Sequence, residues 1–236
     1  MAPSWREPAE SLAGDLRTVF GERLHAVCVY GAHAEGDGGA GPISCLALVA
    51  SVNAGDLDAC ARLVPRWHRR GLATPLLLPR YEFVRSLDAF PLEYGEMIRA
   101  HARVYGDDPF AGIAIAPEDL RRACETQVKS HLLHLREEYI EAAGRPLAIA
   151  ELVQASAPAF AALLRNVARL HGASAGDRAS VTREGARLAG LPERVVSDVL
   201  ALEHPSPLTS ADPARLFPEY LAAVEQLARF VDAWRA

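Results

Sequence analysis

Hydrophobic positions in the first half of the chain alternate between helical and strand-like spacing. Leu12, Leu16 and Leu24 recur at helical intervals and predict an amphipathic helix over residues 7–24, and a second helix is expected over 56–71. Short apolar runs outside these helices predict strands. The predicted strands cover residues 25–30, 43–52, 75–78 and one or two parts of 90–105, interrupted at Gly95. This order of elements indicates a small sheet covered by helices over residues 1–112.

The pattern changes after Gly112, where every long apolar repeat has helical spacing. Segments rich in Gly, Pro or Ser separate these repeats from one another. The predicted helices cover residues 117–143, 148–171, 180–189, 192–202 and 213–234. We therefore expect an α+β protein, in which a small mixed-sheet α/β domain (1–112) is followed by an all-α helical bundle (113–236).

Composition places the chain among cytoplasmic globular proteins. Half of its 236 residues are hydrophobic, 23% are charged, and the net charge of −5 makes nucleic acid an unlikely general partner. The N-terminus lacks the basic and apolar regions of a signal peptide, and no stretch of about eighteen uncharged apolar residues predicts a membrane span. The four cysteines form no C-x-x-C pair, which favours reduced, buried thiols.

A glycine-rich turn follows the first predicted strand. Residues 27–37 read Val-Cys-Val-Tyr-Gly-Ala-His-Ala-Glu-Gly-Asp and lead into another apolar strand. This order resembles the polymerase-beta-like nucleotidyltransferase superfamily, in which a Gly-Ser turn ends one strand and the next strand carries Asp-x-Asp. Residues 90–93 (Phe-Pro-Leu-Glu) and 104–109 (Val-Tyr-Gly-Asp-Asp-Pro) resemble the late strand and exit turn of members with a kanamycin-nucleotidyltransferase-type helical domain. The resemblance covers residues 12–139, with 125–139 similar to the first helix of that domain.

The resemblance implies nucleotidyl transfer, in which carboxylates hold Mg²⁺ against a nucleoside triphosphate. This sequence departs from the pattern at the turn, where Ala32 replaces the serine, and at the next strand. The Asp-x-Asp pair falls either on Pro42 and Ser44 or on Ser44 and Leu46, and neither register supplies a carboxylate. No Asp or Glu occurs between Asp37 and Asp56. We therefore expect no metal site and no cofactor, unless transfer survives with Mg²⁺ and a nucleoside triphosphate.

The resemblance also implies where a ligand would bind. The turn residues Gly31 and Ala32, together with Ser44, would face a small phosphate-bearing ligand in a cleft between the two domains. Glu93 stands where the family has its third carboxylate and is the candidate catalytic residue, with a polar strand end as its alternative role. Glu35 and Asp37 offer a substitute metal site, against the simpler reading of a solvated loop.

Two further patterns lie in the predicted bundle. Arg165 and His171 match the loose R-x(4–6)-H spacing of HEPN-type ribonucleases, although cations at a helix C-terminus would look the same. His131 and His134 are three residues apart and could share a metal, but His131 falls on the apolar stripe and is better read as a satisfied core or boundary histidine.

Three hypotheses for function follow. The first is a nucleotidyltransferase-like protein that has lost metal-dependent transfer and acts as a ligand-binding or regulatory module. The second is an active nucleotidyltransferase that attaches a nucleoside monophosphate to a small molecule or a protein. The third is a structural or antitoxin-like partner, with apolar bundle surface available for a homodimer.

Overall fold

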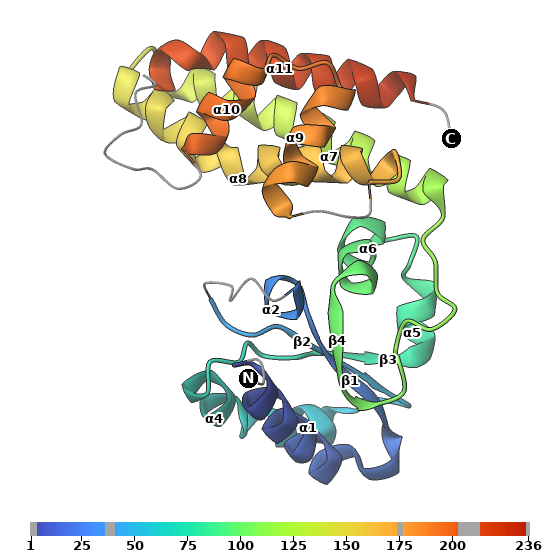
Figure 1. The fold of residues 1–236 in the computed structure, drawn as a ribbon. Helices are drawn as coiled ribbons and strands as arrows, with labels where there is room; N and C mark the ends of the chain where they lie inside the picture. Colours follow the sequence, from blue (N-terminus) through green and yellow to red (C-terminus); the bar gives the residue numbers. More distant parts are fainter. Residues whose placement is uncertain (1–3, 36–40, 174–176, 203–212, 235–236) are drawn as a thin grey trace. The chain divides into compact units, whose positions relative to one another are not determined.

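The computed structural model describes residues 4–35, 41–173, 177–202 and 213–234 (Figure 1). The chain divides into two compact units, Met1–Ile115 and Ala116–Ala236. The first unit contains a small mixed sheet and the second is helical, which confirms the predicted α+β class.

The sheet of the first unit has the strand order β3-β2-β1-β4. Its strands are β1 (Leu24–Tyr30), β2 (Cys45–Val49), β3 (Leu76–Pro79) and β4 (His101–Gly106). β1 pairs antiparallel with both β2 and β4, whereas β2 and β3 run parallel. All five residues of β2 are buried because both faces of the sheet are covered. The central position of β1 and β2 explains their continuous apolar sequences.

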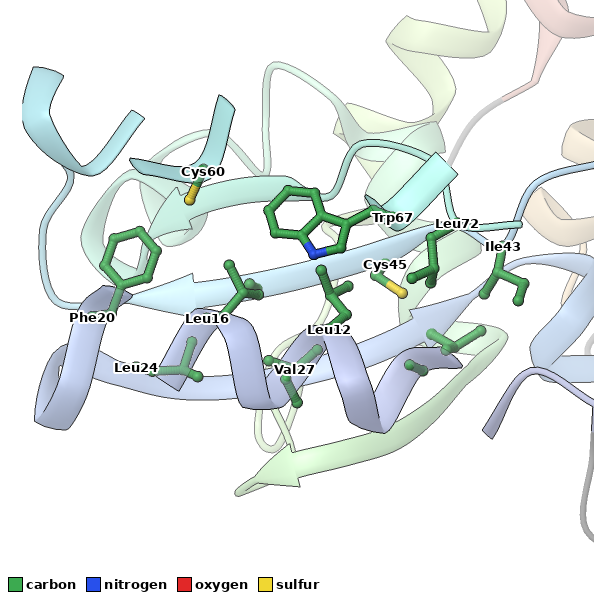
Figure 2. Packing of buried hydrophobic residues seen from close by; sticks show 14 of the residues in the cluster. Leu12, Leu16, Phe20, Leu24, Val27, Ile43, Cys45, Cys60, Trp67 and Leu72 are labelled. Carbon is green, nitrogen blue, oxygen red and sulfur yellow. The ribbon is translucent and has the colours of Figure 1, made fainter. Parts of the chain in front are cut away.

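One face of the sheet packs against α1 (Arg6–Phe20), α3 (Ala54–Ala61) and α4 (Val64–Arg69). Leu12 and Leu16 of α1 lie one helical turn apart and are fully buried with Trp67 of α4 (Figure 2). Burial of each such leucine contributes about 1.5–3 kcal/mol to the free energy of folding. The half-buried Asp15 carboxylate accepts hydrogen bonds from the Trp67 indole and from Arg66, and so ties α1 to α4.

The other face packs against α5 (Arg80–Arg85) and α6 (Pro91–Arg99). Phe83 is fully buried there, with Tyr94 at 4.9 Å and Phe110 at 5.7 Å between ring centroids. Cys28 and Leu46 of the central strands complete this cluster. Aromatic pairs at these distances add to the stability gained from burial alone.

The structure corrects four sequence predictions in this unit. The first helix ends at Phe20 rather than Leu24, because Gly21 adopts a φ of +57° and begins a 3₁₀ turn, η1 (Gly21–Arg23). The second expected strand is shorter than 43–52. The expected helix 56–71 is two helices, because α3 ends at Ala61 and Pro65 opens α4. Residues 91–99 form the helix α6 rather than a strand, so within 90–105 only the residues from His101 onward form a strand.

The second unit is a bundle of α7 (Pro117–Glu141), α8 (Pro146–Leu170), α9 (Arg178–Leu188), α10 (Glu193–Ala201) and α11 (Pro213–Ala233). These helices confirm the five predicted from apolar periodicity, with ends that differ by one to two residues. Gly185 of α9 lies so close to α8 that an added Cβ would be 1.9 Å from the Leu164 carbonyl oxygen. The close approach of these two helices therefore depends on the missing side chain.

Helix α8 supplies much of the bundle core. Val153, Phe160 and Leu164 are fully buried against the neighbouring helices. In the described part of the chain it is the one helix with the length and hydropathy that a membrane span requires. The apolar composition of α8 is explained more simply by its buried face, which is typical of a core helix.

Candidate functional site

The turn that carries the family resemblance lies at the end of the central strand β1. Gly31 adopts a φ of +76°, which favours glycine, and the chain then forms one turn of helix, α2 (Ala32–Glu35). The Gly31 carbonyl accepts hydrogen bonds from the amides of Ala34 and Glu35. The Gly31 amide donates to the Ala100 carbonyl at 2.9 Å. This amide is therefore occupied by the protein itself, contrary to the expectation that it faces a ligand.

Three polar side chains stand in a row across the sheet next to this turn. The Tyr30 amide donates to the Ser44 carbonyl at 3.0 Å, and Tyr30 is the cross-strand partner of His101. The residues thus occupy neighbouring positions on β1, on the approach to β2 and on β4. Cross-strand partners point to the same face of a sheet. Burial raises the pKa of the Tyr30 hydroxyl, and a hydrogen bond with Ser44 opposes that rise.

The residues where the family has Asp-x-Asp do not fit a magnesium ion. Pro42 is exposed, Ser44 is half-buried, and Leu46 is fully buried in the core below α6. Mg²⁺ gives up its water ligands reluctantly and is held in proteins by carboxylates. A hydroxyl and two apolar side chains supply no negative charge in either register. No group of three or more metal-ligating side chains occurs among the residues that the structure describes.

Two of the acidic side chains near the turn already have side-chain partners. The Glu35 carboxylate lies 2.6 Å from the Arg99 guanidinium, and the Asp108 carboxylate lies 3.3 Å from Nε2 of His101. These partners compete with any metal ion for the carboxylate oxygens. Asp37, the other residue of the proposed substitute metal site, lies outside the described residues.

Glu93 differs most from its expected surroundings. It lies in the first turn of α6, on the exposed side of the helix, and not at the end of a strand. The buried residues of this helix are Pro91, Leu92, Tyr94 and Met97. Residues 90–105 were expected to contain strands, but Leu92 and Tyr94 lie on the buried face of this helix.

His101 is a site residue that the sequence did not single out. Its Nδ1 lies 3.0 Å from the Ile98 carbonyl, and its ring packs edge-on against Phe110 at 4.7 Å. A carbonyl only accepts hydrogen bonds, so Nδ1 must carry a proton. The other ring nitrogen, Nε2, lies 3.3 Å from the Asp108 carboxylate. The nearest signal in the sequence was the expectation of a late strand within 90–105.

Buried thiols add no nucleophile to this region. Burial raises the pKa of Cys28 and of Cys45 to about 12, so both remain protonated near neutral pH. All four cysteines are buried and unbonded, which confirms the prediction of free, buried thiols.

The two histidines of the bundle motif make separate contacts and do not face one ligand. His131 is held at 2.9 Å from the Tyr220 hydroxyl, whereas His134 is exposed and pairs with Glu137 at 3.2 Å. His131 is half-buried and hydrogen-bonded, which agrees with its reading as a satisfied core or boundary histidine.

Arg165 and His171 contact different helices of the bundle. The Arg165 guanidinium lies 3.5 Å from the Thr182 hydroxyl of α9, and the His171 ring packs 5.4 Å from the Phe230 ring of α11. Six residues along an α-helix correspond to a rotation of about 600°, which places the two side chains on different sides. The structure does not bring them together as a catalytic pair.

Comparison with known proteins supports the fold. No protein-family model matches the chain, and no curated protein matches its sequence. Among eight matching chains of solved structures is the crystal structure of spectinomycin adenyltransferase AAD(9) from Enterococcus faecialis with ATP and spectinomycin. The two share 10% sequence identity and a TM-score of 0.59, over 96% of this chain and 98% of that chain. At this identity the likeness concerns the fold alone, and the chain has a nucleotidyltransferase-like fold.

Proposed function

We propose that this protein binds a small phosphate-bearing ligand beside the Gly31 turn and does not carry out metal-dependent nucleotidyl transfer. The observation that carries the proposal is the composition of the strand after the turn. Ser44 and its neighbours bring no carboxylate to the end of the sheet, whereas nucleotidyl transfer needs a divalent cation held there.

Two observations support a phosphate-bearing ligand. The structural neighbour was solved with ATP, and the two folds agree over nearly their whole lengths. The turn region of this chain keeps groups that suit phosphate oxygens, namely the Ser44 hydroxyl and the Ala32 amide. Residues able to bind a phosphate can persist when those that hold the catalytic metal are lost.

A transfer assay with α-labelled nucleoside triphosphates tests the proposal. Purified protein, with MgCl₂ or with EDTA, is incubated with small-molecule acceptors and with bacterial lysate, and labelled products are separated. We expect no labelled product under either condition. Label that reaches an acceptor and disappears when Mg²⁺ is chelated would show an active enzyme.

A thermal scan with the same nucleotides in EDTA tests the binding half of the proposal. Ligand at 100 times its Kd adds about 2.7 kcal/mol to the free energy of unfolding, which raises Tm measurably. A rise in EDTA supports metal-independent binding. A rise that requires Mg²⁺ contradicts it, because the proposed site has no group to hold the cation.

A further inference from the structure

One arginine lies against the short helix that follows the Gly31 turn. The Arg99 guanidinium is 2.6 Å from the Glu35 carboxylate of α2 and 3.2 Å from Glu96, one turn earlier on α6. The side chains of Arg99 and Glu35 are 29% and 21% exposed. Both side chains are therefore mostly covered by the protein, but solvent still reaches part of each one.

The backbone fixes this arginine at the turn. Ala100, the next residue after Arg99, accepts the hydrogen bond of the Gly31 amide at 2.9 Å. The end of α6 and the start of α2 are thus joined by a backbone hydrogen bond and by the ion pair. Among the described residues, Arg99 is the cation that forms an ion pair with α2.

We propose that Arg99 is the residue that binds the phosphate group of the ligand, and that Glu35 occupies its place until the ligand arrives. This inference rests on the function proposed above and names the residue that replaces the missing metal as the source of positive charge. A guanidinium offers parallel N–H donors that match carboxylate and phosphate oxygens equally well in shape. In the absence of ligand, the Glu35 carboxylate therefore occupies the position on Arg99 that the ligand phosphate would take.

The balance of charge favours exchange. A terminal phosphate carries close to two negative charges near neutral pH, whereas Glu35 carries one. A partly exposed ion pair contributes little to folding, so the displacement of Glu35 costs little. The helix that Glu35 leaves is only four residues long, and two backbone hydrogen bonds to Gly31 hold it without the side chain. Ligand binding then exchanges one anionic partner of Arg99 for a more highly charged one.

Titration calorimetry with inorganic tripolyphosphate in EDTA tests this exchange on the full chain. Glu35→Gln removes the competing charge and should bind tripolyphosphate about twofold to fivefold more tightly than the wild type, the range expected for one partly exposed ion pair. Arg99→Gln should weaken binding by about tenfold or more, as expected when a charge-assisted hydrogen bond is lost. Arg99→Lys keeps the charge without the paired donors, so an intermediate affinity is expected.

Matched controls come from exposed side chains of the same unit. Glu22→Gln in η1 and Arg62→Gln after α3 make the same changes of charge away from the turn, and each should bind as the wild type does. If Arg99→Gln fails to fold, Arg99→Lys and Glu35→Gln still test the proposal.

The outcomes separate this inference from the proposed function. Binding by the wild type that neither Glu35→Gln nor either Arg99 variant changes would overturn the role of Arg99 and leave the phosphate site standing. An equal effect of Glu35→Gln and Glu22→Gln would reduce the result to net charge and overturn the exchange. No binding by the wild type and by Glu35→Gln would contradict both proposals.

Discussion

Arg23 donates two hydrogen bonds to the Asp56 carboxylate, at 2.8 and 2.7 Å. Asp56 also accepts the amide hydrogen of Asn53, whose side chain in turn caps the start of α3. Arg23 is the last residue of η1 and immediately precedes β1. The pair therefore fixes the N-terminus of α3 to the start of the central strand, at the opposite end of β1 from the Gly31 turn.

The Arg23–Asp56 pair should make the stability of the protein sensitive to acid. The hydrogen bond from Arg23 lowers the pKa of Asp56 below its ordinary value of 3.8. As pH falls below about 4, the unfolded chain takes up the proton while the folded state still excludes it, so this contribution is full above that pH and is lost as pH falls through the folded pKa. Thermal melts of the wild type and Asp56→Asn should show the largest difference in Tm near pH 6 and a smaller one near pH 3.

Asp58→Asn is the control for this experiment, because Asp58 lies exposed on the same helix. It should leave Tm nearly unchanged across the same range. A constant difference between the wild type and Asp56→Asn from pH 6 to pH 3 would contradict the assigned titration.

Gly106, at the end of β4, should not tolerate a side chain. Its φ is +73°, and an added Cβ would lie 1.9 Å from the His25 carbonyl oxygen of β1. Gly106→Ala should lower the free energy of unfolding by roughly 2–4 kcal/mol, because the backbone is strained and the two strands must separate. Urea unfolding monitored by tryptophan fluorescence measures the change.

Gly14→Ala is the matched control. Gly14 lies within α1, and nothing is within 4 Å of an added Cβ there. This substitution should stabilise the protein by about 0.5–1 kcal/mol, since alanine is the better helix former. Equal effects of the two substitutions would show that β4 does not approach β1 as described.

The sequence was sufficient to predict elements whose signal is local and repeated. The spacing of Leu12 and Leu16 predicted α1, and the same periodicity predicted all five helices of the bundle. Local patterns failed where they were short. Residues 91–99 carry two apolar alternations that suit a strand as well as a helix, and α5 spans only six residues. Only the surrounding packing distinguishes these alternatives, because Phe83 and Tyr94 must meet across one face of the sheet.

The sequence predicted which residues are missing from the candidate site better than it predicted the contacts that the site contains. The absence of carboxylates between Asp37 and Asp56 is visible directly in the sequence. The contacts of Arg99 with Glu35 and of the Gly31 amide with Ala100 join residues that are far apart along the chain. No local pattern predicts them, since they depend on β4 lying beside β1.

His131 should make the stability of the bundle fall below neutral pH. Burial lowers the pKa of this histidine from 6.5 to about 4, and the nearby His134 adds to the effect. Between these values the unfolded chain binds a proton that the folded state excludes, so stability is full above about pH 6.5 and falls toward pH 4. The loss should reach roughly 2–3 kcal/mol. In His131→Gln, which cannot titrate, urea unfolding followed by circular dichroism should depend less on pH over this range.

His134→Gln provides the comparison, because His134 is exposed on the same helix. It should retain most of the pH dependence of the wild type. A wild-type dependence that persists unchanged in His131→Gln would assign the proton uptake to another group.

Carboxylates placed just before β2 should create a metal site next to the Gly31 turn. Pro42 and Ser44 are two residues apart in an extended segment, so their side chains point to the same face about 7 Å apart along the chain. Pro42→Asp combined with Ser44→Asp should bind Mn²⁺, detected by electron paramagnetic resonance, at least tenfold more tightly than the wild type, because carboxylates are the ligands that such hard cations prefer.

Ala50→Asp combined with Ser51→Asp adds the same charge at the exposed far end of the strand, where adjacent residues point to opposite faces. This control should bind Mn²⁺ little better than the wild type. Tight Mn²⁺ binding by the unaltered protein would show that carboxylates from elsewhere in the chain already converge there, and the proposed loss of metal-dependent transfer would be wrong.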